Sequence, residues 1–239
     1  MPFHFKTFSL EHEKSTLKIG TDSVLLASVI SVNEANTILD IGTGCGVIAF
    51  CLAYKRSLIN NISHHITGID IDTDSITEAK QNKANFPSYS GQQLEFFQSA
   101  LQDFSTETSQ LFDLIVCNPP YFSSSLKPDN PRNLRSKHRD ENLSFEVLFH
   151  GVCRLLSHKG CFYIILPPSE QPEFDAITKD VLFPFVRWEI FPNPYKPAHR
   201  LITGYSFQHT SMLLHKLIIR SACGELTEEY KKITELFYL

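Results

Sequence analysis

The sequence predicts an α/β protein built on a doubly wound, mostly parallel β-sheet with helices on both faces and antiparallel strands at the C-terminal end. Strand-like and helix-like segments alternate through the first two thirds of the chain, and a glycine-rich turn separates the first core strand from the helix after it. The last third is rich in strand-like runs. In sheets of this kind, ligands bind at the carboxyl ends of the strands.

The expected strands and helices follow one another in the order that this fold requires. A β-branched run at 37–41 predicts the first core strand, and the apolar segment 47–54 after the glycines predicts a helix. The next strand is expected at 66–71, and the helix after it begins with Asp72 or Thr73 as its cap and extends to about residue 86. The later segments predict strands at 94–98, 112–117 and 160–166, helices at 145–156 and 171–181, and strand-like runs at 185–191, 201–207 and 213–220.

Length and composition predict one soluble, cytoplasmic domain over residues 1–239. Hydrophobic residues make up 42% of the chain, and no linker-like tract divides it. The apolar runs are too short to span a membrane, and the N-terminal residues lack the features of a signal peptide. Because the six cysteines contain no Cys-x-x-Cys pair and the histidines are scattered, we expect no metal site. We favour a monomer.

The charges are unevenly distributed along the chain. The formal net charge of -4 argues weakly against a nucleic-acid partner. One stretch nevertheless gathers cationic side chains against a single Asp129, namely Lys127, Arg132, Arg135, Lys137, His138 and Arg139. This stretch is either a solvated loop or a surface that binds phosphates.

Three glycines occupy alternating positions in the turn after the first core strand. Asp40 and Ile41 precede Gly42-Thr43-Gly44-Cys45-Gly46, and residues without a Cβ atom let the backbone turn sharply and approach a ligand. Asp70 ends the second strand, 24 residues beyond Gly46, where a carboxylate can accept hydrogen bonds from both hydroxyls of a ribose. The glycine spacing departs from the Gly-x-Gly-x-x-Gly pattern that binds dinucleotides.

The strand expected at 112–117 ends abruptly in Asn118-Pro119-Pro120-Tyr121. The two prolines make this turn rigid and leave carbonyl groups unpaired. An amino nitrogen attached to an aromatic ring is a poor nucleophile because its lone pair is delocalised. Two acceptors for its N–H groups, the Asn118 side-chain oxygen and the Pro119 carbonyl, favour a tetrahedral nitrogen, and Tyr121 offers a face on which the ring stacks. We therefore expect the catalytic site at these four residues.

Both motifs resemble those of class I S-adenosylmethionine-dependent methyltransferases. In that class the glycine loop backs the methionine part of the cofactor, and an Asn/Asp-Pro-Pro-Tyr/Phe signature marks enzymes that methylate adenine N6, guanine N2 or glutamine amides. The resemblance implies S-adenosyl-L-methionine as cofactor and a Rossmann-like fold with a seven-stranded sheet. The cofactor-binding residues that it implies are Thr21, Asp22, Asp40, Gly42, Thr43, Gly44, Gly46, Asp70, Ile71, Ser99, Ala100 and Asn118.

The two ends of the chain resemble one family within this class. Residues 18–26, Lys-Ile-Gly-Thr-Asp-Ser-Val-Leu-Leu, and residues 226–230 and 236–239 are similar to the ends of bacterial valine-tRNA (adenine-37-N6) methyltransferases. This implies N6-methylation of adenosine 37 in a valine tRNA, with the basic stretch on the RNA and residues 1–35 as an extension near the cofactor site. Thr21 and Asp22 either line the methionine end of that site or cap the helix beginning near Ser23.

Some alternatives stay open at this point. Many class I methyltransferases contact the cofactor adenine through an acidic residue after the third strand, whereas this chain has Gln98-Ser99-Ala100, so a backbone amide near Ala100, with Ser99, is the expected contact. Other functions compatible with the motifs are a protein glutamine N5-methyltransferase, an rRNA guanine-N2 methyltransferase and a non-catalytic cofactor-binding module. The 36 residues before the first core strand are too few for the helical domain usual in the glutamine enzymes.

Overall fold

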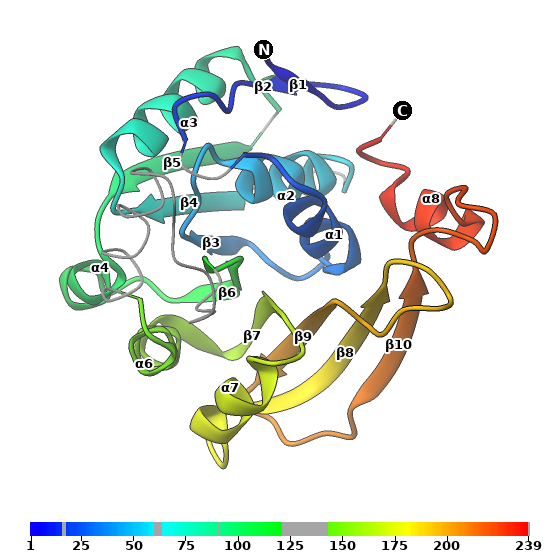
Figure 1. Ribbon diagram of the computed structural model, residues 1–239. Helices are drawn as coiled ribbons and strands as arrows, with labels where there is room; N and C mark the ends of the chain where they lie inside the picture. The colour runs from blue at the N-terminus through cyan, green and yellow to red at the C-terminus, as the bar shows by residue number, and fades with distance from the viewer. Residues whose placement is uncertain (16–17, 60–63, 90, 121–142, 239) are drawn as a thin grey trace, which may run out of the picture.

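The computed structural model describes residues 1–15, 18–59, 64–89, 91–120 and 143–238 (Figure 1). Its centre is an eight-stranded sheet in the order β5-β4-β3-β6-β7-β9-β8-β10. Within this sheet the strand β9 runs antiparallel to both of its neighbours, and the other pairs are parallel. The strands are β3 Thr37–Ile41, β4 His64–Asp70, β5 Gln92–Gln98, β6 Phe112–Cys117, β7 Leu156–Leu166, β8 Phe183–Phe191, β9 Arg200–Ser206 and β10 Leu213–Ile218.

The expectation of a mostly parallel sheet with antiparallel pairing near the C-terminus is confirmed. The sheet differs from the expected seven strands because β10 adds an eighth at its edge, parallel to β8. The run at 213–220 predicted a strand but not the strand with which it pairs. β10 follows β9 in the chain, yet it pairs with β8, which lies on the far side of β9 from β7.

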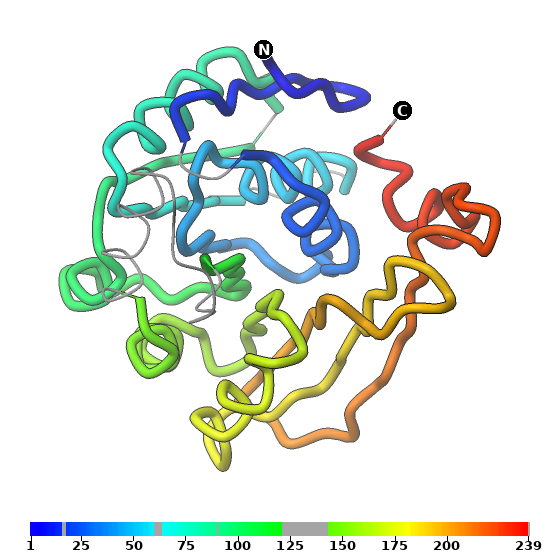
Figure 2. Tube along the Cα trace, viewed as in Figure 1, coloured from blue at the N-terminus to red at the C-terminus, as the bar shows by residue number. Residues whose placement is uncertain are grey.

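Helices cover both faces of the sheet, as Figures 1 and 2 show. On one face α1, α2 and α3 contribute to a core that includes Leu25, Phe50 and Ile76. On the other face α4, α6 and α7 contribute to a second core around Leu148 and Phe174. The helices are α1 Thr21–Val29, α2 Val47–Ser57, α3 Thr73–Asn85, α4 Leu101–Glu107, α6 Phe145–Leu155, α7 Gln171–Thr178 and α8 Glu228–Thr234.

The N-terminal segment packs on this framework through aromatic side chains. A short hairpin of β1 (Phe3–His4) and β2 (Ser9–Leu10) brings Phe5 onto Phe8 with ring centroids 4.6 Å apart. Phe8 in turn meets Phe86 at the end of α3 at 5.0 Å. Because Phe5 and Phe8 are buried, these rings form part of the packed core.

None of the described helices is both long and apolar enough to cross a membrane.

The start of α2 depends on a glycine that no other residue could replace without strain. Gly46, the N-cap of α2, has φ of 89°, and a Cβ atom built on it would lie 2.6 Å from Phe50 Cε2 and 3.0 Å from Phe96 Cζ. Gly42 also has a positive φ, 70°, but a Cβ there would meet no described atom within 4 Å. The two positions therefore share the backbone strain and differ in the steric clash.

We predict that Gly46→Ala destabilises the protein more than Gly42→Ala does. Both variants adopt a left-handed conformation at a cost of about 1–2 kcal/mol, and only Gly46→Ala overpacks the buried Phe50, which adds about 1–3 kcal/mol. Urea denaturation of the two variants measures the difference. Equal losses in the free energy of unfolding would contradict the steric argument.

Candidate active site

A cavity of about 720 Å³ opens at the carboxyl ends of β3, β4, β5 and β6, beside the start of α1. The strand register explains its place: Ile41 pairs with both Ile69 and Cys117, and Asp70 pairs with Gln98. The four strands consequently end at the same edge of the sheet. The residues predicted for the site that line this cavity are Thr21, Asp22, Gly42, Thr43, Gly44, Asp70, Ile71, Ser99, Asn118, Pro119 and Pro120.

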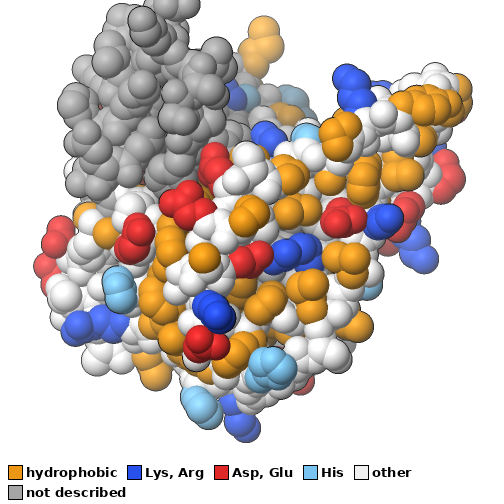
Figure 3. All heavy atoms as spheres, turned by 60° about the horizontal axis from the view of Figure 1, so that its bottom comes forward, with side chains coloured by type: hydrophobic (Ala, Val, Ile, Leu, Met, Phe, Trp, Pro, Cys, Tyr) orange, Lys and Arg blue, Asp and Glu red, His pale blue; other side chains and the backbone are white. Residues whose placement is uncertain are grey.

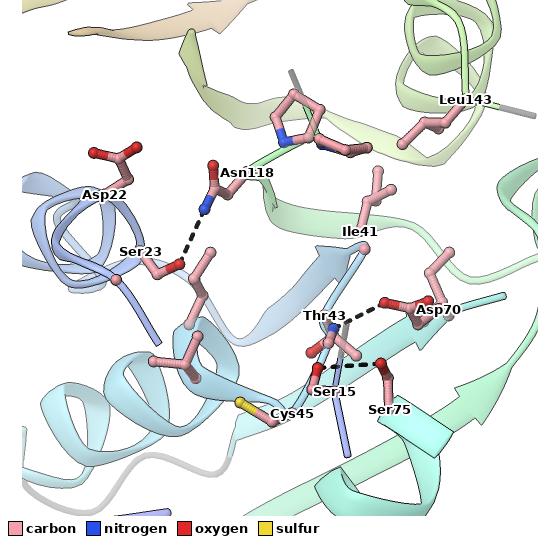
Figure 4. Close-up of a pocket in the computed structure, with 18 of the residues that line it drawn as sticks. Ser15, Asp22, Ser23, Ile41, Thr43, Cys45, Asp70, Ser75, Asn118 and Leu143 are labelled. Atoms are coloured by element: carbon pink, nitrogen blue, oxygen red, sulfur yellow. Dashed lines mark hydrogen bonds between the residues drawn. The ribbon is translucent and has the colours of Figure 1, made fainter. Parts of the chain in front are cut away.

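Asp70 is fixed by backbone donors from two directions. Its Oδ2 accepts a hydrogen bond of 2.9 Å from the Gly44 amide, and its Oδ1 accepts one of 2.9 Å from the Asp72 amide. The amides of Gly42 and Thr43 donate to the Ile69 carbonyl at 2.9 and 3.0 Å. The glycine loop and the end of β4 are therefore held together, and the Asp70 carboxylate is oriented at the cavity wall (Figure 4).

Asp72 caps α3, as predicted: its side chain accepts a hydrogen bond from the Ser75 amide.

Three residues expected to contact the cofactor, Asp40, Gly46 and Ala100, do not line the cavity; Asp40 and Gly46 are buried, and Ala100 is half-buried. Gly46 faces Phe50 and Phe96, and Ala100 is the N-cap of α4. Asp40 is completely buried, where its Oδ2 accepts hydrogen bonds from Thr43 Oγ1 at 2.7 Å and from the Ala49 amide at 3.2 Å. Asp40 therefore supports the glycine loop and the first turn of α2 from within the core.

The buried Asp40 carboxyl has an unusual protonation equilibrium. Loss of hydration raises its pKa to about 7, against the opposing effect of the hydrogen bonds from Thr43 and Ala49, and the nearby negative charge of Asp70 raises it further. Its Oδ1 is buried without a hydrogen-bond partner among the described residues. The ionised form of Asp40 is thus disfavoured in the folded protein.

The structure places the Asn118 side chain against the first turn of α1. Asn118 Nδ2 donates a hydrogen bond of 3.0 Å to Ser23 Oγ, and Figure 4 shows its side-chain oxygen pointing away from Ser23. Pro119 and Pro120 continue the cavity wall. Tyr121 lies outside the described residues, as do the basic residues Lys127, Arg132, Arg135, Lys137, His138 and Arg139.

The start of α1 is joined to the C-terminal part of the sheet by an ion pair. Arg200 Nε, at the first residue of β9, donates to Asp22 Oδ2 at 2.8 Å. The N-cap residue of α1 is Gly20, so Thr21 and Asp22 belong to the first turn of the helix and line the cavity instead of capping it.

Strand β5, the third strand of the core in chain order, ends beside the part of the cavity expected to hold an adenine. The Ser99 amide donates to the Asp70 carbonyl at 3.0 Å, which links the ends of β4 and β5. Ser99, Leu101 and Gln102 line the cavity there.

Several residues that line the cavity could not be predicted from the sequence. Ser23 lies within the N-terminal motif at 18–26, but the sequence does not show that its side chain contacts Asn118. His199 and Arg200 belong to no motif. They lie at the cavity because β9, which begins at Arg200, pairs between β7 and β8 in the sheet. The other missed lining residues are Ser15, Lys18, Gly20, Ile41, Cys45, Val47, Ile48, Ile69, Ser75, Leu101, Gln102 and Leu143.

We predict that Asp40 makes the stability of the wild-type protein fall as pH rises from about 4 to about 7. The folded state holds a proton that the unfolded chain, with an ordinary Asp pKa, releases over this range, which costs up to about 4 kcal/mol. Asp40→Asn keeps an acceptor for Thr43 and Ala49 but does not titrate. The stability of Asp40→Asn relative to wild type should therefore increase between pH 5 and pH 8 in chemical denaturation, and parallel pH profiles would refute the assignment.

Known methyltransferases are similar to this chain in sequence and in fold. Residues 33–184 match the family model described as a methyltransferase domain. A predicted O-methyltransferase from Agrobacterium tumefaciens has a similar fold, with a TM-score of 0.66 at 16% identity over 90% of this chain and 96% of the other. A class I S-adenosylmethionine-dependent methyltransferase from Listeria monocytogenes gives a TM-score of 0.57 at 15% identity over 84% and 66%. Rossmann-like class I methyltransferases thus share this fold.

Two bacterial tRNA methyltransferases are similar to this chain over nearly their whole length. The tRNA1(Val) (adenine(37)-N6)-methyltransferase of Bacteroides fragilis is 35% identical over 99% of this chain and 97% of its own. The enzyme of the same name from Photorhabdus laumondii is 30% identical over 99% of this chain and 95% of its own. The chain therefore belongs to the tRNA1(Val) (adenine(37)-N6)-methyltransferase family.

Proposed function

We propose that this protein transfers a methyl group from S-adenosylmethionine to N6 of an adenine in tRNA, at adenosine 37 of a valine tRNA as the names of its relatives state. The observation that supports it best is the juxtaposition of Asn118 with the glycine loop and Asp70 around one cavity. The enzyme then acts in the cytoplasm, where tRNA is its macromolecular partner. We also propose that residues 1–239 form one domain.

The cavity fits the cofactor in size and in chemistry. Its volume lies within the range of about 300–1,000 Å³ that small-molecule sites occupy. Gly42 leaves open space where a side chain would stand, which lets a ligand approach the backbone closely. The Asp70 carboxylate lines the cavity, and each carboxylate oxygen can accept more than one hydrogen bond, so Asp70 is suited to bind ribose hydroxyls.

On these grounds we assign parts of the cavity to parts of the cofactor. Gly42, Thr43 and Gly44 would hold the methionine end together with Thr21 and Asp22, which line the same cavity. Asp70 and Ile71 would hold the ribose, and Ser99, Leu101 and Gln102 would surround the adenine. Asp40 acts indirectly, because it orients Thr43. When bound, S-adenosylmethionine supplies a methyl group attached to a positively charged sulfur.

Asn118 has the central role in the chemistry. Its side-chain oxygen accepts a hydrogen bond from the adenine amino group, and the Pro119 carbonyl accepts a second. These two acceptors favour a tetrahedral nitrogen whose lone pair is available for attack, and their effect grows as positive charge develops on that nitrogen. The methylated nitrogen is then acidic enough to release its proton to water, so the chemistry requires no general base. Tyr121 is proposed to stack on the base.

The alternative functions are less well supported. A protein glutamine or rRNA guanine-N2 methyltransferase would use the same Asn118 geometry, but the full-length relatives carry names of tRNA adenine methyltransferases. A non-catalytic cofactor-binding module would not require the Asn118 side chain to lie at the cavity wall.

A substrate as large as tRNA must also contact the protein outside the cavity. On the face shown in Figure 3, the Lys and Arg side chains of the described residues are interspersed with Asp and Glu. The loop between β8 and β9 offers a more specific surface: Tyr195 is 79% exposed, Lys196 is exposed, and His199 and Arg200 of the same segment line the cavity. Asn193 Oδ1 accepts a hydrogen bond from the Tyr195 amide at 3.0 Å, which shapes the loop.

We infer that this loop, together with the basic residues from Lys127 to Arg139, contacts the RNA. Tyr195 is positioned to stack on a nucleobase, and Lys196 to neutralise a phosphate.

Asn118→Ala should lower the single-turnover rate of methyl transfer to unmodified tRNA by roughly two powers of ten, because it removes a preorganised acceptor. The dissociation constant of S-adenosylhomocysteine should stay close to the wild-type value. Asn33→Ala, at an exposed residue of a loop, is the matched control. An Asn118→Ala enzyme with a near wild-type rate would disprove the catalytic assignment.

Substitution of the loop side chains should weaken RNA capture without affecting the cofactor. Tyr195→Ala is expected to cost about 1–3 kcal/mol of tRNA binding, and Lys196→Ala to reduce the salt dependence of binding by about one released counterion. Lys159→Ala serves as control, because Lys159 is exposed and lies near the first residue of β7, at the end of that strand away from the cavity. Filter binding of tRNA at several salt concentrations measures both effects. Wild-type affinity and salt slope in the two variants would exclude this loop from the RNA interface.

A further inference from the structure

We propose that Ser23 is a positioning residue, which holds the Asn118 amide with its oxygen toward the substrate amino group. This inference rests on the proposed role of Asn118. The inference gives a function to the first turn of α1. This turn lies outside both the glycine loop and the catalytic tetrapeptide.

The contact between the two side chains is direct. Asn118 Nδ2 donates to Ser23 Oγ at 3.0 Å, across 95 residues of sequence. Ser23 is 7% exposed, and both residues line the cavity. Figure 4 shows the amide nitrogen directed at Ser23 and the amide oxygen directed away from it.

The orientation of this amide decides what it offers to a substrate. A carboxamide carries an acceptor oxygen and a donor NH₂ group on the same planar carbon, and a half-turn of the group exchanges them. An exocyclic amino group presents N–H donors, so it gains a hydrogen bond from the oxygen and none from the NH₂ group. In this structure the Ser23 hydroxyl accepts from Nδ2, and this contact stabilises the productive orientation before the substrate arrives.

Ser23 is itself held firmly in place. The ion pair between Asp22 and Arg200, 2.8 Å long, ties the first turn of α1 to β9. The residues after Ser23, Val24 to Leu26, are completely buried and anchor the helix in the core. The hydroxyl thus has a defined position relative to the end of β6, and a preoriented group need not reorganise during the reaction.

The test compares Ser23→Ala with Ser28→Ala in single-turnover methyl transfer to unmodified tRNA. Ser28 lies on the same helix, but its Oγ bonds to the Val24 carbonyl at 2.7 Å. Ser23→Ala should lower the rate by about tenfold, the effect of one orienting hydrogen bond. Ser28→Ala should leave it unchanged. The dissociation constant of S-adenosylhomocysteine and the thermal midpoint should be similar in both variants, and Ser23→Cys, which keeps a weaker acceptor, should be intermediate in rate.

A double-mutant cycle with Asn118→Asp separates orientation from packing. A carboxylate has two equivalent oxygens and no unproductive orientation, so Ser23→Ala should cost much less in that background than with Asn118. A loss of rate that is equal in both backgrounds, or equal for Ser23→Ala and Ser28→Ala, would overturn the proposal. If Asn118→Ala is impaired while Ser23→Ala transfers methyl at the wild-type rate, the positioning role alone fails. If Asn118→Ala is also unimpaired, the proposed catalytic role fails with it.

Discussion

The parallel register of β3 with its two neighbours is the constraint on which the site depends. Ile41 pairs with Ile69 on one side and with Cys117 on the other, so the residues that follow these strands emerge at one edge of the sheet. This register brings together the glycine turn, the Asp70 carboxylate and Asn118, although up to about 75 residues separate them. A shift of register by one residue would move each of these groups away from the others.

The energetics of the site show how its polar groups are accommodated. Asp70 at the cavity wall is oriented by backbone amides, whereas Asp40 is buried behind the glycine loop with its pKa raised to about 7 by loss of hydration. A buried carboxyl of this kind lowers stability, yet it orients Thr43 and the first turn of α2. Polar groups that reduce stability while they position a binding loop are typical of functional sites.

Much of the fold and of the site could be predicted because the relevant information is local. The alternation of strands and helices, the Asp72 cap and the cavity residues of the glycine loop all follow from short stretches of sequence. The position of β10 beside β8, the ion pair of Asp22 with Arg200 and the contact of Ser23 with Asn118 could not be predicted, because each joins segments whose proximity depends on the assembled sheet. Sequence pattern also could not separate residues at the cavity surface from residues just behind it. Asp40, Gly46 and Ala100 lie next to lining residues in the chain but do not line the cavity themselves.

The most direct test of the account uses the wild-type protein and a valine tRNA that lacks the modification. After incubation with S-adenosylmethionine carrying a labelled methyl group, the tRNA is digested and its nucleosides are separated. We expect label in N6-methyladenosine, and we expect it to be lost when adenosine 37 of the transcript is replaced by guanosine. Label in N2-methylguanosine, or no label in the tRNA while S-adenosylhomocysteine still binds, would contradict it.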